Sequence, residues 1–170
     1  DPSAVFYMEK LVTGPEAAEF VDLRLPVKQN LHLVAKAKGK KVSELTVCVL
    51  DRPRHAKLIQ EIRDAGARTR IILAACRENT GVDLMLGTGG TPEGVVAACA
   101  IKATGGVIQG RLAPTDEAER EKALAAGHDL DRVLTTNDLV TSDNCFFAAT
   151  GITDGKLLRG VRYNKNVVTT

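Results

Sequence analysis

The sequence predicts an α/β fold in which a mostly parallel sheet is covered by helices on both faces. Short apolar runs typical of strands alternate with segments that repeat apolar residues at helical spacing, which favours parallel strands joined by helices. The run at 45–50 is continuously apolar, as in strands that are buried on both faces. With 170 residues, 44% of them hydrophobic, the chain has the size of one domain, which we place at residues 1–170.

The first 70 residues predict two strands, each followed by a helix. Leu31, Val34 and Ala37 recur at helical spacing and define the buried face of the first helix. Glycine and proline mark where these elements end, because neither residue continues a regular helix or strand easily. The expected elements are a strand at 5–12, a helix from Pro26 to Gly39, a strand at 45–50 and a helix at 58–65.

The remaining residues divide in a similar way. Gly105-Gly106 separates a helix of small apolar residues from a strand, and Thr115 is placed to cap a charged helix. The run at 145–149 contains two phenylalanines and predicts another buried strand. The expected elements are a helix at 95–103, a helix after Thr115, and strands at 71–73, 83–86, 107–110, 145–149 and 161–170.

Composition and charge exclude several classes of partner. A net charge of +2 gives no general attraction for nucleic acid or a membrane surface, and no run reaches the ~18 apolar residues of a membrane-spanning helix. There is no tryptophan to stack on bases. The four cysteines match no zinc pattern and no secretory signal opens the chain, so we expect free thiols and a cytoplasmic location.

Three loops are candidates for ligand binding, because ligands of parallel α/β sheets bind at the carboxyl ends of the strands. The loops that follow predicted strands are 51–55, 87–94 and 150–155.

The loop at 87–94 is the strongest of the three signals. Its glycines allow the backbone to approach an anion closely, and Pro92 suits the first turn of the helix that follows. Glu93 has two interpretations: it complements the positive end of the helix, or it binds a hard cation that also touches phosphate. The loop matches neither a Walker loop nor a dinucleotide-binding fingerprint.

The turn Arg52-Pro53-Arg54-His55 places two guanidinium groups at the end of a strand. Arginine matches phosphate oxygens two at a time, so the turn is suited to a phosphate group. The alternative is a surface turn whose arginines pair with nearby carboxylates. His55 taken alone favours a structural role, and Tyr7 either offers its hydroxyl to phosphate or packs in the core.

Four segments share one resemblance. They are Asp1–Leu11, Thr46–His55, Gly87–Gly94 and Ala148–Gly155. In this order they resemble class II fructose-1,6-bisphosphatases, over nearly the whole chain. The resemblance implies the layered α/β fold of the lithium-sensitive sugar phosphatases. It also implies gluconeogenic hydrolysis of fructose 1,6-bisphosphate to fructose 6-phosphate and phosphate, with Mg²⁺ or Mn²⁺ as cofactor and a dimer or tetramer of identical chains.

The resemblance also implies roles for individual residues. Glu93 matches a metal-binding carboxylate of the family. The family's other metal carboxylates belong to an N-terminal half, so the catalytic residues are expected outside these 170 residues. An Asp-Gly-Asp substrate loop of the family has no counterpart after Leu73. The positions that match substrate contacts are Tyr7, Arg52, Pro53, Arg54 and Gly90.

Two alternatives to a complete phosphatase stay open. One is a sugar-phosphate-binding module without catalysis, which would use the same arginines and glycines but no metal. The other is an inactive fragment of the enzyme, because one carboxylate does not assemble a site for two metal ions.

Overall fold

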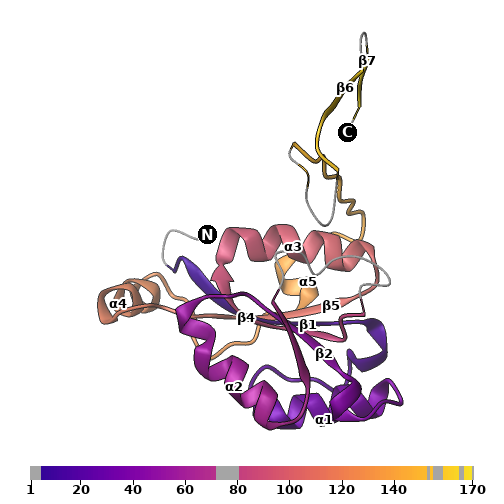
Figure 1. Cartoon of the computed structure of the whole chain (residues 1–170). Coiled ribbons are helices and arrows are strands. Elements are labelled where there is room, and N and C mark those ends of the chain that lie inside the picture. Colours follow the sequence, from indigo (N-terminus) through magenta and orange to yellow (C-terminus); the bar gives the residue numbers. More distant parts are fainter. Residues whose placement is uncertain (1–4, 72–80, 153, 155–158, 165–166, 170) are drawn as a thin grey trace.

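A computed structural model describes residues 5–71, 81–152, 154, 159–164 and 167–169. These residues form a five-stranded sheet with helices on both faces (Figure 1). The strand order across the sheet is β3-β2-β4-β1-β5. The strands are β1 (Tyr7–Thr13), β2 (Thr46–Val49), β3 (Arg68–Ile71), β4 (Leu84–Gly90) and β5 (Val107–Leu112).

The α/β class is confirmed, but the sheet is mixed rather than mostly parallel. β2 pairs in parallel with both β3 and β4, whereas β1 is antiparallel to both β4 and β5. Helix α3 (Thr91–Ala103) connects β4 to β5, and these two strands run in the same direction with β1 between them. The sequence pattern missed this because it shows which segments are strands but not which strand enters the gap left by a crossover.

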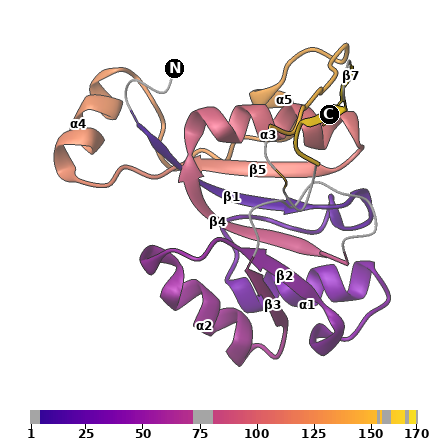
Figure 2. The same cartoon turned by 45° about the horizontal axis from the view of Figure 1, so that its top comes forward.

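Two pairs of helices cover the sheet from opposite sides. Helices α1 (Val27–Ala37) and α2 (Ala56–Asp64) pack on one face, and α3 packs with the short α5 (Thr136–Leu139) on the other (Figures 1 and 2). Helix α4 (Glu117–Ala125) lies to one side of the sheet (Figure 2).

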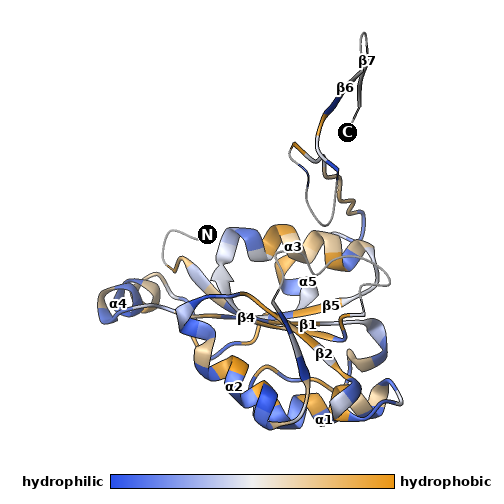
Figure 3. Ribbon diagram, viewed as in Figure 1, coloured by the Kyte–Doolittle hydropathy of each residue, from blue (hydrophilic) through white to orange (hydrophobic). Residues whose placement is uncertain are grey.

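The largest core lies between the sheet and helices α1 and α2. Leu31 and Val34 of α1 are fully buried there, as their spacing predicts, and they join apolar residues of β1, β2 and β4. A smaller cluster between the sheet and α3 contains Ala98, Ile101 and Ile108. Figure 3 shows the same pattern, with apolar central strands and a largely polar α4.

The described residues also form single-turn 3₁₀ helices, and helix α4 has a side-chain cap. The 3₁₀ helices are η1 (Pro15–Ala17), η2 (Val42–Glu44) and η3 (Pro53–His55). Helix α4 is capped by Asp116, which accepts from the Glu119 amide at 2.8 Å, and not by the predicted Thr115. The Thr115 hydroxyl instead donates to the Glu119 carboxylate.

The prediction of a buried strand at 145–149 is wrong. These residues form neither helix nor strand, and Phe146 is 85% exposed. Shortly after this segment, Ile152 is 81% exposed as well. An apolar run predicts that a segment will be buried but not by what, and the described residues place no strand beside this one. The tail does form strands, β6 (Arg162–Asn164) and β7 (Val167–Thr169), in a hairpin that projects beyond α3 (Figure 1).

Some predictions fall on residues that the structure does not describe, namely part of the strand at 71–73, two residues of the loop at 150–155, and Cys76. Of the described helices, none is long and apolar enough to span a membrane.

Candidate functional site

The candidate site lies where the carboxyl ends of β2 and β4 meet. These strands are parallel neighbours, with Val47 opposite Leu84 and Cys48 opposite Met85. The η3 turn follows β2, helix α3 follows β4, and the first residues of β1 lie beside the end of β4. Two of the three predicted loops, at 51–55 and 87–94, are therefore brought together at one edge of the sheet, as expected for this fold.

The prediction of a loop at 87–94 is wrong, because these residues belong to a strand and a helix. Gly87–Gly90 belong to β4 and pair with Lys10–Tyr7 of β1, and the helix begins directly at Thr91. The Thr91 amide donates to the carbonyl oxygen of Phe6 at 2.7 Å. Strand propensities count against glycine, so the sequence pattern alone places such residues in a loop.

The glycines make room for three side chains. A β-carbon at Gly87 would lie 3.2 Å from Cε1 of His55, and one at Gly94 would lie 2.7 Å from Cε of Lys10. A β-carbon at Gly90 would overlap the carboxylate of Glu93. The absence of side chains therefore allows His55, Lys10 and Glu93 to approach the end of β4 closely.

The arginine turn is docked on a single residue of β4. Nε and Nη2 of Arg54 both donate to the carbonyl oxygen of Thr88, at 3.0 and 2.9 Å. The guanidinium of Arg54 also lies over the ring of Tyr7, 5.1 Å from its centroid, in a cation–π contact. Tyr7 is paired with Gly90 in the sheet. Three of the predicted substrate-contacting residues are thus neighbours.

The two arginines of the turn keep their charges free of acidic partners among the described residues. Arg52 is exposed, and its Nη1 donates to the carbonyl oxygen of Asp51 at 2.9 Å. Arg54 donates to a carbonyl as well, and Pro53 between them opens the η3 turn. The alternative of a surface turn whose arginines pair with carboxylates therefore has no support in the described part of the chain.

Lys10 is part of the site, although it is not among the residues predicted from the sequence. It is only 7% exposed, between β1 and α3, and its Nζ donates to the carbonyl oxygen of Gly90 at 2.6 Å. The pKa of Lys10 is lowered, mainly because the side chain is buried. The nearby Glu93 carboxylate opposes this shift, and the positive charge of Arg54 adds to it. Glu93 and Arg54 therefore act electrostatically on the same ammonium group.

One sequence signal could have identified Lys10. In β1, Met8 lies on the same face of the strand as Lys10, because residues two apart share a face. Met8 is buried against Gly94 and Gly110. A lysine in register with a buried methionine predicts a buried charge, and buried charges often mark functional sites.

The described residues of the third candidate loop lie away from this edge of the sheet (Figure 1). In the part of 150–155 that is described, Asp154 accepts from the Gly160 amide and pairs with Arg162 at 2.9 Å. This segment leads into the hairpin that projects beyond α3 (Figure 1). The sequence placed it at a strand end only because it also predicted a buried strand at 145–149.

The sequence is similar to those of known proteins. Residues 2–170 match the model of a family described as bacterial fructose-1,6-bisphosphatase, glpX-encoded. The chain belongs to this family.

Several class 2 fructose-1,6-bisphosphatases are similar to the chain. The protein of Haemophilus influenzae is 42% identical over 185 residues, which cover 96% of this chain and 56% of the relative. Fructose-1,6-bisphosphatase 1 class 2 of Escherichia coli K12 is 40% identical over 185 residues, which cover 96% of this chain and 55% of the relative. The chain spans about half the length of these relatives.

Glu93 is the candidate metal ligand that the sequence predicts in the described part of the chain. No group of three or more His, Cys, Asp or Glu side chains is placed to hold a metal ion among the described residues. Glu93 is exposed in the first turn of α3 and offers the hard oxygen atoms that Mg²⁺ and Mn²⁺ prefer. It fits one ligand of such an ion, and a complete site needs others.

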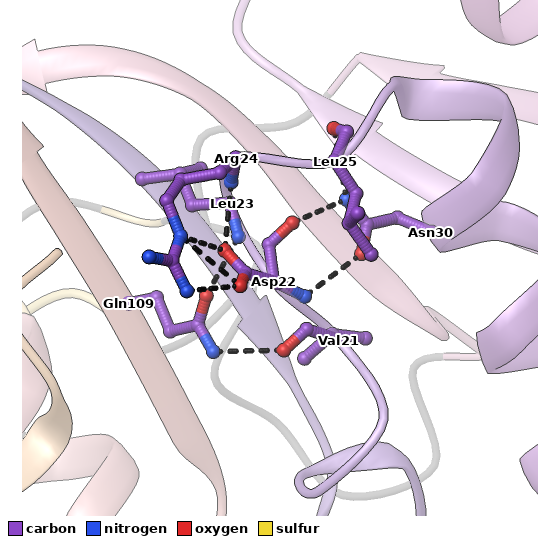
Figure 4. A network of polar contacts seen from close by, with 7 residues as sticks. All are labelled: Val21, Asp22, Leu23, Arg24, Leu25, Asn30 and Gln109. Carbon is purple, nitrogen blue, oxygen red and sulfur yellow. Dashed lines mark hydrogen bonds and ion pairs between the residues drawn. The ribbon is translucent and has the colours of Figure 1, made fainter.

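A second polar cluster is structural. Gln109 of β5 donates to the Val21 carbonyl and accepts from the Leu23 amide (Figure 4). Asn30 exchanges two hydrogen bonds with the backbone of Asp22, whose carboxylate pairs with Arg24. These groups satisfy one another and fix the segment 21–25 between β5 and α1, so they leave no unpaired charge for a ligand.

Proposed function

We propose that the protein containing this chain hydrolyses fructose 1,6-bisphosphate to fructose 6-phosphate and phosphate. The family and its named relatives support this activity. The observation that supports a role for this chain in substrate binding is the environment of Arg54. Its guanidinium contacts Thr88 and Tyr7 and has no carboxylate partner among the described residues. A fixed cation without a neutralising partner is suited to a phosphate group.

The substrate is held from one edge of the sheet in this proposal. Arg52 and Arg54 bind one phosphate of the sugar, with Pro53 setting the backbone between them. The hydroxyl of Tyr7 and the backbone of Gly90 border the same position. Because Arg54 lies over the Tyr7 ring, the two side chains hold each other in place, which reduces the conformational entropy lost when the substrate binds.

Glu93 would contribute one carboxylate ligand for Mg²⁺ or Mn²⁺, and a bound ion would supply polarisation of the phosphate and a lower pKa for a bound water. The chain's own contribution is to hold this carboxylate in the first turn of α3, above Gly90 and near the ammonium of Lys10. The remaining metal ligands and the groups that activate water lie outside the described residues.

Measuring phosphate release from fructose 1,6-bisphosphate by the whole protein, with Mg²⁺, with Mn²⁺ and without a metal, tests this function. Glu93→Gln should abolish most of the metal-stimulated rate and weaken Mn²⁺ binding measured by calorimetry. Glu117→Gln changes a carboxylate in the first turn of another helix, α4, and should behave like the wild type. Wild-type protein that releases no phosphate with either metal would contradict the proposal.

A sugar-phosphate-binding module without catalysis is the second candidate, favoured because the described residues include no group of three or more His, Cys, Asp or Glu side chains that could hold a metal ion. Such a module would bind fructose 1,6-bisphosphate equally well in the presence and absence of Mn²⁺. Calorimetry under both conditions separates the two functions, because the phosphatase should bind its substrate more tightly with the metal.

Assembly and location are also proposals. In a homo-oligomer, a dimer or a tetramer, the exposed side chains of Phe146 and Ile152 would be buried against another copy of the chain. Light scattering measures the mass of the assembly. Among the described residues, the free thiols of Cys99 and Cys145 support a reducing, cytoplasmic location.

A further inference from the structure

His55 is buried at the junction between the arginine turn and β4. It is the last residue of η3, directly after Arg54, and only 2% of it is exposed. Its Nδ1 lies 2.9 Å from the carbonyl oxygen of Leu50, and its Nε2 lies 2.9 Å from the amide nitrogen of Thr88. Both ring nitrogens are therefore engaged with backbone atoms, one on each side of the junction.

These two contacts determine the tautomer. The amide of Thr88 is only a donor, so Nε2 must carry the lone pair that accepts it. Nδ1 then carries the proton and donates to the carbonyl of Leu50, which is only an acceptor. His55 is thus a neutral imidazole with one defined tautomer, and neither nitrogen is free to transfer a proton to a substrate.

Thr88 connects His55 to the predicted phosphate ligand. Its amide donates to His55, and its carbonyl oxygen accepts two hydrogen bonds from Arg54. Two consecutive residues of the turn, Arg54 and His55, therefore hydrogen-bond to the carbonyl and the amide of the same residue of β4. Because Arg54 is exposed, this attachment and the Tyr7 ring are what define the direction of its guanidinium.

The glycine at position 87 permits this arrangement. A β-carbon there would lie 3.2 Å from Cε1 and 3.3 Å from Nε2 of the imidazole, closer than side chains normally approach. The φ of Gly87 is also positive, at 152°, a region that other residues rarely adopt. His55 therefore couples the arginine turn to the glycine segment, two motifs that are separate in the sequence.

We propose that His55 is a positioning residue: its Nδ1-protonated imidazole clamps the η3 turn to β4 and so aims Arg54 at the phosphate of the substrate. This inference rests on the proposed function for the identity of the substrate. The clamp itself is a property of the described residues.

A mutant cycle in the whole protein tests the proposal, using calorimetric affinity for fructose 1,6-bisphosphate and the split between KM and kcat. His55→Gln should weaken binding by roughly 10- to 100-fold, as expected when a binding group is misaimed. It should raise KM far more than it lowers kcat. The double variant with Arg54→Gln should bind no worse than Arg54→Gln alone, because His55 acts through Arg54. His32→Gln, on the exposed side of α1, is the control.

A second measurement does not depend on how the variants fold. Nitrogen-15 NMR of the wild-type protein should show His55 protonated at Nδ1 and unprotonated at Nε2 near neutral pH. Protonation at Nε2, or losses that are additive in the double variant, would overturn the proposal. Wild-type protein that binds but does not hydrolyse the bisphosphate would contradict the proposed function instead, while the tautomer and the binding cycle still decide the role of His55.

Discussion

The ammonium of Lys10 donates to the carbonyl oxygen of Gly90 at 2.6 Å, across the junction where β4 becomes helix α3. Gly90 is the residue over which the Glu93 carboxylate folds, and it pairs with Tyr7 in the sheet. Lys10 therefore holds in place the backbone that separates the predicted metal ligand from the predicted phosphate ligands.

Replacing Lys10 by methionine tests this role, because methionine preserves the length and packing of the side chain but removes its charge. The carbonyl of Gly90 then loses a charge-assisted donor in a buried site, so the free energy of unfolding should fall by about 1–3 kcal/mol. Urea denaturation measures it. Lys36→Met, on the exposed side of α1, should change it little. Unchanged or increased stability of Lys10→Met would show that relief of the buried charge outweighs the lost hydrogen bond.

Substituting Gly94 by alanine tests the packing of the same lysine. In most helices this change is stabilising by about 0.5–1 kcal/mol, because glycine loses more backbone entropy on folding. Here the new β-carbon would lie 2.7 Å from Cε of Lys10 and 3.3 Å from the sulfur of Met8. We expect overpacking to dominate and the free energy of unfolding to fall by about 1–3 kcal/mol. A rise in the thermal midpoint would contradict this close contact.

Some features of the fold can be predicted from the sequence and others cannot. The buried face of α1 follows from periodicity, and the meeting of the arginine turn with the glycine segment follows from the rule for strand ends. The antiparallel insertion of β1 does not follow, because pairing partners are decided by long-range contacts. The exposure of Phe146 does not follow either, because hydrophobicity does not say what will cover a residue.

The candidate site shows the same division. The family resemblance predicts Tyr7, Arg54 and Gly90 as substrate ligands, and the structure places Tyr7 beside both of the others. Thr88 has no local motif, and the pattern in β1 indicates only that Lys10 is buried; the roles of both come from contacts to residues distant in the sequence. Such contacts are visible only after the sheet has assembled.

Glu119 should make stability depend on pH in the acid range. The pKa of Glu119 is lowered from 4.5 by hydrogen bonds from the Phe6 amide first, and then from the amide and hydroxyl of Thr115. A lowered carboxyl pKa stabilises the folded state above 4.5, and this contribution is lost as the pH falls through the folded-state value.

Comparing Glu119→Gln with the wild type by urea denaturation checks this sign. The wild type should be the more stable at pH 7, and the difference should shrink as the pH falls below 4.5. Glu121→Gln, an exposed position on the same helix, is the control. A difference that grows on acidification would be incompatible with the hydrogen bonds described.

The affinity of the whole protein for fructose 1,6-bisphosphate after the change Arg54→Gln tests whether the arginine turn and the end of β4 form one phosphate-binding site. Each charge-assisted hydrogen bond contributes roughly 1.5–3 kcal/mol, so calorimetry should show binding weakened by about 10- to 100-fold. Arg63→Gln, on α2, should bind like the wild type. Equal affinity of Arg54→Gln and the wild type would contradict the account.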